Sequence, residues 1–391
     1  TPLNDNYKQN TMKKTTLLFL LLTSLGYAQT ITRSFPITAS SVGYSMGSSA
    51  PIVQTTDGGY LLNYSYSYPN WDAGAGYGTT VIKTDANFVP QWSRKLYGGN
   101  GKKTFVLGDG SVLLFSGLGN LLKLDANGQT VMSKGNFTTY PIQLVISDAE
   151  LVGTTIKAVG SVDTYNGFGW VTSSIAVMVD FDLDGNLLQT QVLGSLKRPS
   201  NILHDALGNC YVAGYLGNQG SYIYKIGANN TVLWAKRFQS PIANSSTSIN
   251  DLKILANGDV ILAGYFYNYE TSLGSMLLCR LSPDGSLISA KANGVYVSSF
   301  DSITVLPDGG LVATGFLRET DLSFSRTFAM RMDSSGAISW SKLYNEGFAI
   351  SAPLVKETNN WYYAAFHNNY TDNNNPIVFN TENTGVIDCP Y

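Results

Sequence analysis

The sequence predicts an all-β protein made of repeated units, and three observations support this prediction. A turn followed by an apolar strand recurs about every 50 residues along the 391-residue chain. Each unit contains a second hairpin, in which an Asp/Asn-x-Gly turn joins two short apolar runs. After residue 28, no segment shows the 3.6-residue periodicity of an amphipathic helix.

The first hairpin of each unit defines the repeat. Its clear copies are "TTDGGYLLNYS" (55–65), "LGDGSVLLFSG" (107–117), "DALGNCYVAGY" (205–215), "LANGDVILAGY" (255–265), "LPDGGLVATGF" (306–316) and "ETNNWYYAAF" (357–366). A degenerate copy, "LVGTTIKAVGS" (151–161), fills the double interval between the second and third of these. The sequence therefore contains seven units.

Each unit has enough apolar runs for four strands. One run precedes the first turn, as in "DSITVLP", and the second hairpin supplies two more, as in "LLCRLSPDGSLISAK" (277–291). Four antiparallel strands in about 50 residues are typical of a β-propeller blade. We therefore predict a seven-bladed β-propeller of four-stranded antiparallel blades, as a single domain over residues 29–391.

The N-terminal strand is expected to close the ring. "TITRSF" (30–35) resembles the outer strands "WSRKLY" (92–97) and "WSKLY" (340–344), but no strand precedes it to pair with. The seventh unit stops just after its third strand. Pairing the first strand with the last unit would remove two exposed sheet edges.

The beginning of the chain predicts export. Met12-Lys13-Lys14 is followed by an apolar stretch (15–26) and by small residues up to Ala28. This order is that of a signal peptide, which we assign to residues 12–28 with cleavage after Ala28. Residues 1–11 are interpreted as an upstream extension or a gene-model artefact. We expect a secreted protein or one at the outer cell surface.

The repeat resembles a known group of proteins. "TTDGGYLL…VIKTDANFVPQWSRKLYGG" is similar to the DGGY-repeat β-propeller proteins secreted by Bacteroidota, often through the type IX secretion system. The resemblance covers residues 30–389 and implies a propeller fold and export. It also raises one alternative role, that of a structural spacer before a C-terminal sorting domain beyond Tyr391.

Composition and charge exclude some partners. The chain has 25 Lys and Arg against 27 Asp and Glu, and the basic residues are scattered singly. A nucleic-acid groove or an anionic membrane surface requires clustered basic residues. We expect no nucleic-acid partner, no membrane insertion and a monomer. Cys210 and Cys279 lie in strand-like segments and are expected to be buried free thiols.

Two short motifs have competing interpretations. Gly43-Tyr44-Ser45-Met46-Gly47 fits the G-x-S-x-G nucleophile pattern, but no helix is predicted after Ser45, so we interpret the match as accidental. The segment 180–186 alternates carboxylates as calcium loops do, without the closing acidic ligand. We favour a plain hairpin turn and predict no cofactor, with calcium as the alternative. The metal candidates are Asp180, Asp182 and Asp184.

Two side-chain types recur at fixed positions and are expected to be structural. A basic residue stands in the third strand of five units, and we predict inter-blade ion pairs or hydrogen bonds to turn carbonyls there. These residues are Lys83, Lys123, Lys225, Arg280 and Arg331. Tryptophan recurs in the outer strand, where packing between blades is expected. These residues are Trp92, Trp234 and Trp340.

The connections between second and third strands are the predicted binding surface. Both hairpin turns of a blade lie on one face, so these connections emerge together on the opposite face, which we call the long-loop face. They are long and rich in Tyr, Trp, Asn and Asp, which suit stacking on sugar rings or docking on a protein. The expected contact residues are Tyr68, Trp71, Tyr165, Trp170, Tyr267, Tyr269 and Tyr370, with Asp72 and His367 as polar partners.

The sequence therefore favours a secreted or cell-surface propeller that binds an extracellular polysaccharide or protein. The alternative is an enzyme on the same scaffold, such as a glycoside hydrolase, a lyase or a quinoprotein-type dehydrogenase. The innermost strands offer few catalytic candidates, of which Asp301 is one, and we assign no catalytic residue.

Overall fold

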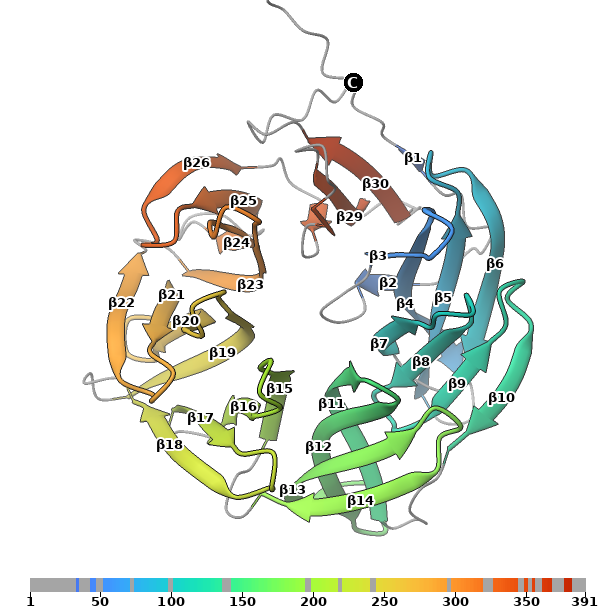
Figure 1. Ribbon diagram of the computed structural model, residues 1–391, viewed down its shortest axis with the longest axis horizontal. Coiled ribbons are helices and arrows are strands. Elements are labelled where there is room, and N and C mark those ends of the chain that lie inside the picture. The colour runs from blue at the N-terminus through green and yellow to red at the C-terminus, as the bar shows by residue number, and fades with distance from the viewer. Residues whose placement is uncertain are drawn as a thin grey trace, which may run out of the picture.

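The computed structural model describes residues 33–34, 43–46, 52–70, 74–97, 101–135, 142–193, 198–216, 220–239, 244–293, 297–318, 326–343, 348–350, 354–355, 361–367 and 376–381. The strands of these residues form seven antiparallel sheets around a central axis (Figure 1). No helix occurs in the ranges given above, and in particular none that is long and apolar enough to cross a membrane. The predicted all-β propeller architecture with antiparallel blades is confirmed.

Six of the sheets, which we number blades 1 to 6, are each formed by one continuous part of the chain. Blade 1 contains β2 (Gly43–Met46), β3 (Ile52–Gln54), β4 (Tyr60–Asn70), β5 (Gly74–Thr84) and β6 (Pro90–Tyr97). Blade 2 contains β7 (Gly101–Val106), β8 (Val112–Ser116), β9 (Leu121–Leu124) and β10 (Thr130–Lys134). Blade 3 contains β11 (Ile142–Val152), β12 (Thr155–Tyr165), β13 (Val171–Asp182) and β14 (Leu187–Val192).

Blades 4 to 6 follow the same order from the axis outward. Blade 4 contains β15 (Arg198–His204), β16 (Cys210–Tyr215), β17 (Ser221–Ile226) and β18 (Val232–Phe238). Blade 5 contains β19 (Ser245–Ile254), β20 (Val260–Asn268), β21 (Leu273–Leu281) and β22 (Leu287–Asn293). Blade 6 contains β23 (Val297–Val305), β24 (Leu311–Arg318), β25 (Arg326–Met332) and β26 (Ile338–Leu343).

The remaining sheet is composite, and it corrects the prediction of seven equivalent four-stranded blades. It contains β27 (Phe348–Ile350), β28 (Leu354–Val355), β29 (Trp361–His367), β30 (Pro376–Thr381) and β1 (Arg33–Ser34). The prediction of seven four-stranded blades is wrong, because the described residues form six blades of continuous chain and a separate five-stranded sheet shared by the two ends. The seventh unit of the sequence shares its sheet with the other end of the chain.

The pairing at this junction follows the closure that the sequence predicted. Arg33 lies opposite Val378, and Ser34 lies opposite Ile377. The strand count also differs from four in two sheets, because the inner strand position is divided between two short strands. Both β2 and β3 pair with β4, and both β27 and β28 pair with β29.

The hairpin turns explain the glycine spacing of the repeat. In the first turn of blade 1, the Gly58 N–H donates to the Thr55 carbonyl and the Thr55 N–H donates to the Gly59 carbonyl, both at 2.9 Å. The residue in the fourth position must adopt a positive φ, which is +80° at Gly58. Glycine adopts this conformation without the strain that a Cβ atom would cause.

The core consists of apolar layers between neighbouring blades. The layer between blades 1 and 2 joins Leu61 and Val81 to Leu114 and Leu124. Similar layers lie between blades 2 and 3, 3 and 4, 4 and 5, and 5 and 6. Because both faces of the middle strands are covered, their burial is continuous rather than alternating, as it is over Val112–Phe115.

Four of the five basic residues of the third strands form ion pairs within their own blade, which corrects the predicted inter-blade ion pairs. These are Lys83, Lys225, Arg280 and Arg331. Lys83 Nζ lies 2.8 Å from Asp57 Oδ2 in the first turn of the same blade. The hydrogen bonds from Lys83 and Thr55 lower the pKa of Asp57 to about 2. The predicted bonds to turn carbonyls do occur, and Lys225 Nζ donates to the Pro283 carbonyl of the next blade at 3.2 Å.

Two of the three outer-strand tryptophans, Trp92 and Trp234, connect neighbouring blades as predicted. Trp92 Nε1 donates to the Ala126 carbonyl at 3.0 Å, and Trp234 Nε1 donates to the Pro283 carbonyl at 3.1 Å. Each indole covers the glycine of the next outer turn, so that a Cβ at Gly128 would lie 2.8 Å from the Trp92 ring. The buried free thiols predicted at Cys210 and Cys279 are confirmed.

Candidate functional site

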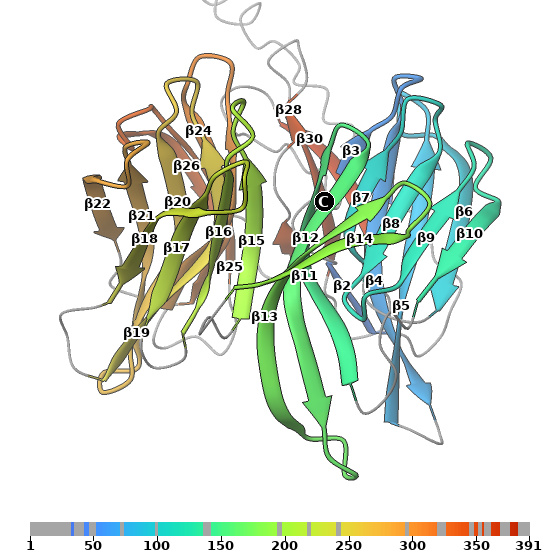
Figure 2. The same cartoon turned by 60° about the horizontal axis from the view of Figure 1, so that its bottom comes forward.

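The long-loop face is uneven because its hairpins differ in length. The paired strands of blades 1 and 3 contain 11 or 12 residues, whereas those of blade 2 contain 5 and 4. Hairpins β4–β5 and β12–β13 project beyond the other strands at the lower edge of Figure 2. At about 3.3 Å per residue, six to eight extra residues in a strand lengthen a hairpin by roughly 20–26 Å.

The end of hairpin β12–β13 presents two exposed aromatic side chains. Phe168 is 89% exposed and Trp170 is 72% exposed. Asn166 fixes the turn, because its Oδ1 accepts hydrogen bonds from the backbone N–H groups of Phe168 and Trp170 at 3.0 and 2.9 Å. We call Phe168, Trp170 and the adjacent exposed Val171 the blade 3 tip. A hydrogen-bonded turn therefore fixes apolar side chains in solvent-exposed positions at this tip.

Of the predicted contact residues, Trp170 and Tyr165 share this hairpin. Tyr165 ends β12 and pairs with Val171 across the hairpin. Its side chain is half-buried, and desolvation together with the charge of Asp163 raises its pKa. The sequence did not single out Phe168, although it occupies the same turn.

Tyr267 and Tyr269 form a second aromatic pair on the long-loop face, at the end of β20. Their rings contact edge to face with centroids 5.1 Å apart. The Tyr269 hydroxyl donates to Ser246 Oγ at 3.2 Å, and its ring is half-exposed. Blade 4 lies between this pair and the blade 3 tip, so the structure does not bring the two groups into one cluster.

The other predicted residues are placed only in part. Tyr68 and His367 belong to strands β4 and β29, whose backbone is described at these positions. Trp71, Asp72 and Tyr370 lie outside the described residues.

Ser45 does not stand in a nucleophile elbow. It lies in the middle of the antiparallel strand β2 and pairs with Ser65 of β4. A nucleophile elbow requires a strand, a sharp turn and a helix in that order. The backbone around Ser45 therefore has the local structure of a propeller strand.

The three aspartates of the calcium candidate have separate partners. Asp180 pairs with Lys157 of β12, with Oδ2 and Nζ 2.8 Å apart. Asp182 Oδ1 accepts from the backbone N–H groups of Asp184 and Asn186, as the aspartates of other outer turns do. No group of three or more potential ligands occurs among the described residues. The segment has the geometry of the repeated hairpin turn.

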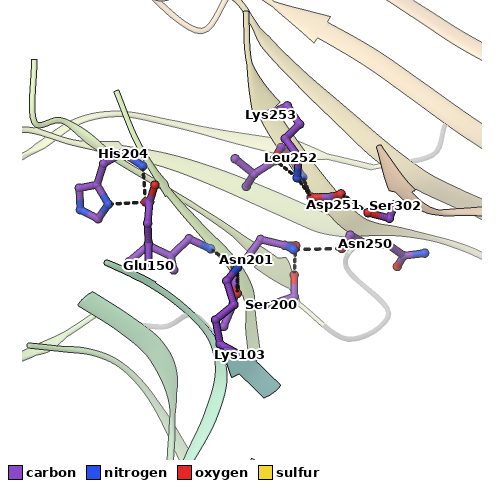
Figure 3. Close-up of polar contacts among 12 residues, drawn as sticks. Lys103, Glu150, Ser200, Asn201, His204, Asn250, Asp251, Leu252, Lys253 and Ser302 are labelled. Carbon is purple, nitrogen blue, oxygen red and sulfur yellow. Dashed lines mark hydrogen bonds and ion pairs between the residues drawn. The ribbon is translucent and has the colours of Figure 1, made fainter. Parts of the chain in front are cut away.

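A polar network that the sequence analysis missed lies on the innermost strands (Figure 3). In blades 2 to 6 the inner strand contains a β-bulge, followed by a polar residue. These residues are Lys103, Asp148, Asn201, Asp251 and Ser302. Their recurrence about every 50 residues was a detectable signal, although their differing chemistry concealed it.

The network connects each blade to the next. Lys103 Nζ lies 3.0 Å from Asp148 Oδ1, and Asp148 Oδ2 accepts from the Ile202 N–H at 3.1 Å. Burial acts to lower the pKa of Lys103, but nearby carboxylates, Asp148 first, outweigh it and the pKa is raised. Asp251 Oδ2 likewise accepts from Ser302 Oγ and the Ile303 N–H at 2.6 and 2.9 Å.

Two further titratable groups lie on these inner strands. Glu150 Oε2 lies 2.8 Å from His204 Nδ1 and also accepts from the His204 backbone N–H at 2.7 Å. Asp301 is the bulged residue of β23, and solvent reaches its side chain. Surrounding protein atoms nevertheless desolvate this carboxylate and raise its pKa to about 6, although a hydrogen bond with Ser299 opposes the shift.

Comparisons with known proteins support the fold. No protein-family model matches the chain, and no curated protein matches it. The solved structure of the Dos1 propeller aligns with 90% of this chain and 96% of its own, with 9% identity and a TM-score of 0.53. YCF48 from Cyanidioschyzon merolae aligns over 91% of this chain and 99% of its own, with 9% identity and a TM-score of 0.51. The chain is therefore a β-propeller.

Proposed function

We propose that this protein is an extracellular binding propeller, whose long-loop face recognises a polysaccharide or a protein. The blade 3 tip is the observation that supports the proposal best. An exposed Phe and Trp on one ordered turn are not needed for the core, because the inter-blade layers are complete without them. Aromatic side chains of this kind anchor binding interfaces when a partner covers them.

The geometry suits binding because the tip is fixed before a partner arrives. Asn166 and the long β12–β13 pairing hold the turn, so that little conformational entropy would be lost on association. The charged groups of the innermost strands, in contrast, are largely engaged with one another. Asp148, Glu150 and Asp251 each accept hydrogen bonds from a neighbouring blade.

A pair of double variants tests the binding surface. Phe168→Ser with Trp170→Ser removes the aromatic tip, and Val232→Ser with Leu233→Ser removes two exposed apolar residues, 55% and 53% exposed, from the outer strand β18. Labelled proteins are applied to an array of polysaccharides and to a display library of extracellular proteins. We expect the first variant to lose binding and the second to keep it. Equal binding by both variants would refute the role of the tip.

Export is a separate part of the proposal, supported by the lysines, the apolar stretch and the small residues of segment 12–28. Expression of residues 12–391 in a Gram-negative host, followed by N-terminal sequencing of the exported protein, tests it. The expected first residue is Gln29. Retention of the uncleaved chain in the cytoplasm would contradict the assignment.

A further inference from the structure

A cavity of about 220 Å³ lies between blades 1 and 2 on the long-loop face. Gly101 connects the two blades at this level, because it pairs with Ser116 of blade 2 and its N–H donates to Thr79 Oγ1 at 2.6 Å. Above that level blade 2 ends in a tight turn, whereas β4 and β5 continue to Asn70 and Gly74. The hairpin β8–β9 of blade 2 is thus shorter than the hairpins β4–β5 and β12–β13 of the two neighbouring blades.

The lining of the cavity is part apolar and part polar. Leu96, Leu114 and Leu122 contribute hydrocarbon surface, and Thr79 and Ser133 contribute hydroxyl groups. Lys134 adds an ammonium group, which donates to Asn186 Oδ1. No carboxylate belongs to the described residues of the lining, so a cationic ligand would have no counter-charge in contact with it.

Behind this wall lies a buried hydrogen-bond acceptor without a partner. The Asn63 side chain is 3% exposed, and its Nδ2 donates to Thr104 Oγ1 at 2.8 Å. Its Oδ1 accepts no hydrogen bond from any described residue. A Cβ at Gly101 would lie 2.9 and 3.0 Å from the Asn63 amide atoms, so the absence of a side chain at Gly101 leaves room for this amide behind the cavity wall.

We infer that this cavity binds a single sugar residue of a glycan, an inference that rests on the proposed function and names its ligand class. The volume is below the roughly 300 Å³ at which pockets for drug-sized ligands begin. A sugar ring combines an apolar C–H face with hydroxyl groups that both donate and accept, which matches leucines beside the hydroxyl groups of Thr79 and Ser133.

Filling the cavity tests the inference. Ser133 is exposed at the cavity mouth, so that Ser133→Trp fills the space without disturbing the core. Ala290 holds the equivalent register position in the outer strand of blade 5, also exposed, and Ala290→Trp is the matched control. Binding of glucose, galactose, mannose, N-acetylglucosamine and glucuronate at millimolar concentration is followed by saturation-transfer NMR.

We expect at least one of these sugars to bind the wild type and the control, and Ser133→Trp to weaken its affinity by about tenfold or more. Absence of binding by the wild type, or equal affinity in Ser133→Trp, would overturn the inference. The tip variant separates this outcome from the proposed function. If Phe168→Ser with Trp170→Ser abolishes capture of a macromolecule while no sugar binds the wild type, the sugar site fails and the binding surface stands.

Discussion

The contact between each outer-strand tryptophan and the next blade predicts a large effect of one methyl group. Gly128 has φ +76°, and a Cβ there would lie 2.8 Å from two atoms of the Trp92 ring. Gly309 has φ +78° in an equivalent type of turn, with nothing within 4 Å of its Cβ position. Gly128→Ala therefore adds a steric cost to a conformational cost, whereas Gly309→Ala has the conformational cost alone.

The magnitudes follow from these two terms. An alanine held at positive φ costs about 1–2 kcal/mol. Displacement of a packed ring adds about 1–3 kcal/mol. We expect a loss of unfolding free energy of about 2–5 kcal/mol for Gly128→Ala and of about 1–2 kcal/mol for Gly309→Ala.

Urea titration of both variants measures the difference in unfolding free energy, provided that the slope of unfolding free energy against urea concentration is the same for both. Trp92→Leu in the Gly128→Ala background provides a coupling test, since a smaller side chain leaves room for the methyl group. The second substitution should then cost less than it does in the wild type. Equal destabilisation by the two alanine variants, or strict additivity with Trp92→Leu, would show that the indole does not hold the blades together.

Three other predictions concern the inner strands and the tip. Asp251→Asn should lower the unfolding free energy by about 3–5 kcal/mol in urea titration, because a buried carboxylate that accepts from four hydrogen-bond donors loses its charge. A loss of unfolding free energy below about 1 kcal/mol would contradict this prediction. Asp301 has a raised pKa in the folded state, so its contribution to stability is greatest below pH 3.8 and is lost as the pH rises through about 6. Asp301→Asn should remove that decline in unfolding free energy, which solvent screening keeps below about 1 kcal/mol. The prediction is refuted if the unfolding free energy of the variant still changes between pH 4 and pH 7 as it does in the wild type. Phe168→Ser with Trp170→Ser should change the unfolding free energy by no more than about 0.5 kcal/mol, since both side chains are exposed; a larger loss in thermal unfolding would mean that the tip packs against the protein.

The repeat made much of the fold predictable because its signals are local. The positive φ of Gly58 and its equivalents follows from turn chemistry within five residues. The role of Trp92 followed from its repetition at one position of the outer strand. The pairing of Arg33–Ser34 with the last unit followed from one unpaired strand at each end.

The ion pairs, the inner polar network and the cavity depend on distances in space, which a repeat alignment does not contain. The partner of Lys83 is Asp57, in the turn before the neighbouring strand β4. The alternation of side chains between the two faces of a strand did not distinguish this turn from one in the next blade. The inner network was missed because Asp148 and Asn201 hold equivalent positions with different chemistry. The cavity over blade 2 depends on the heights of three neighbouring hairpins, so no single unit of the sequence predicts it.

The composite sheet also constrains when the ring can form. Arg33 is among the first described residues to leave the ribosome, yet its partner Val378 is among the last. At about 5–20 residues per second, synthesis separates the two by an interval on the order of tens of seconds. Throughout that interval the nascent protein is an open arc with a free strand edge at each end, so ring closure completes its maturation.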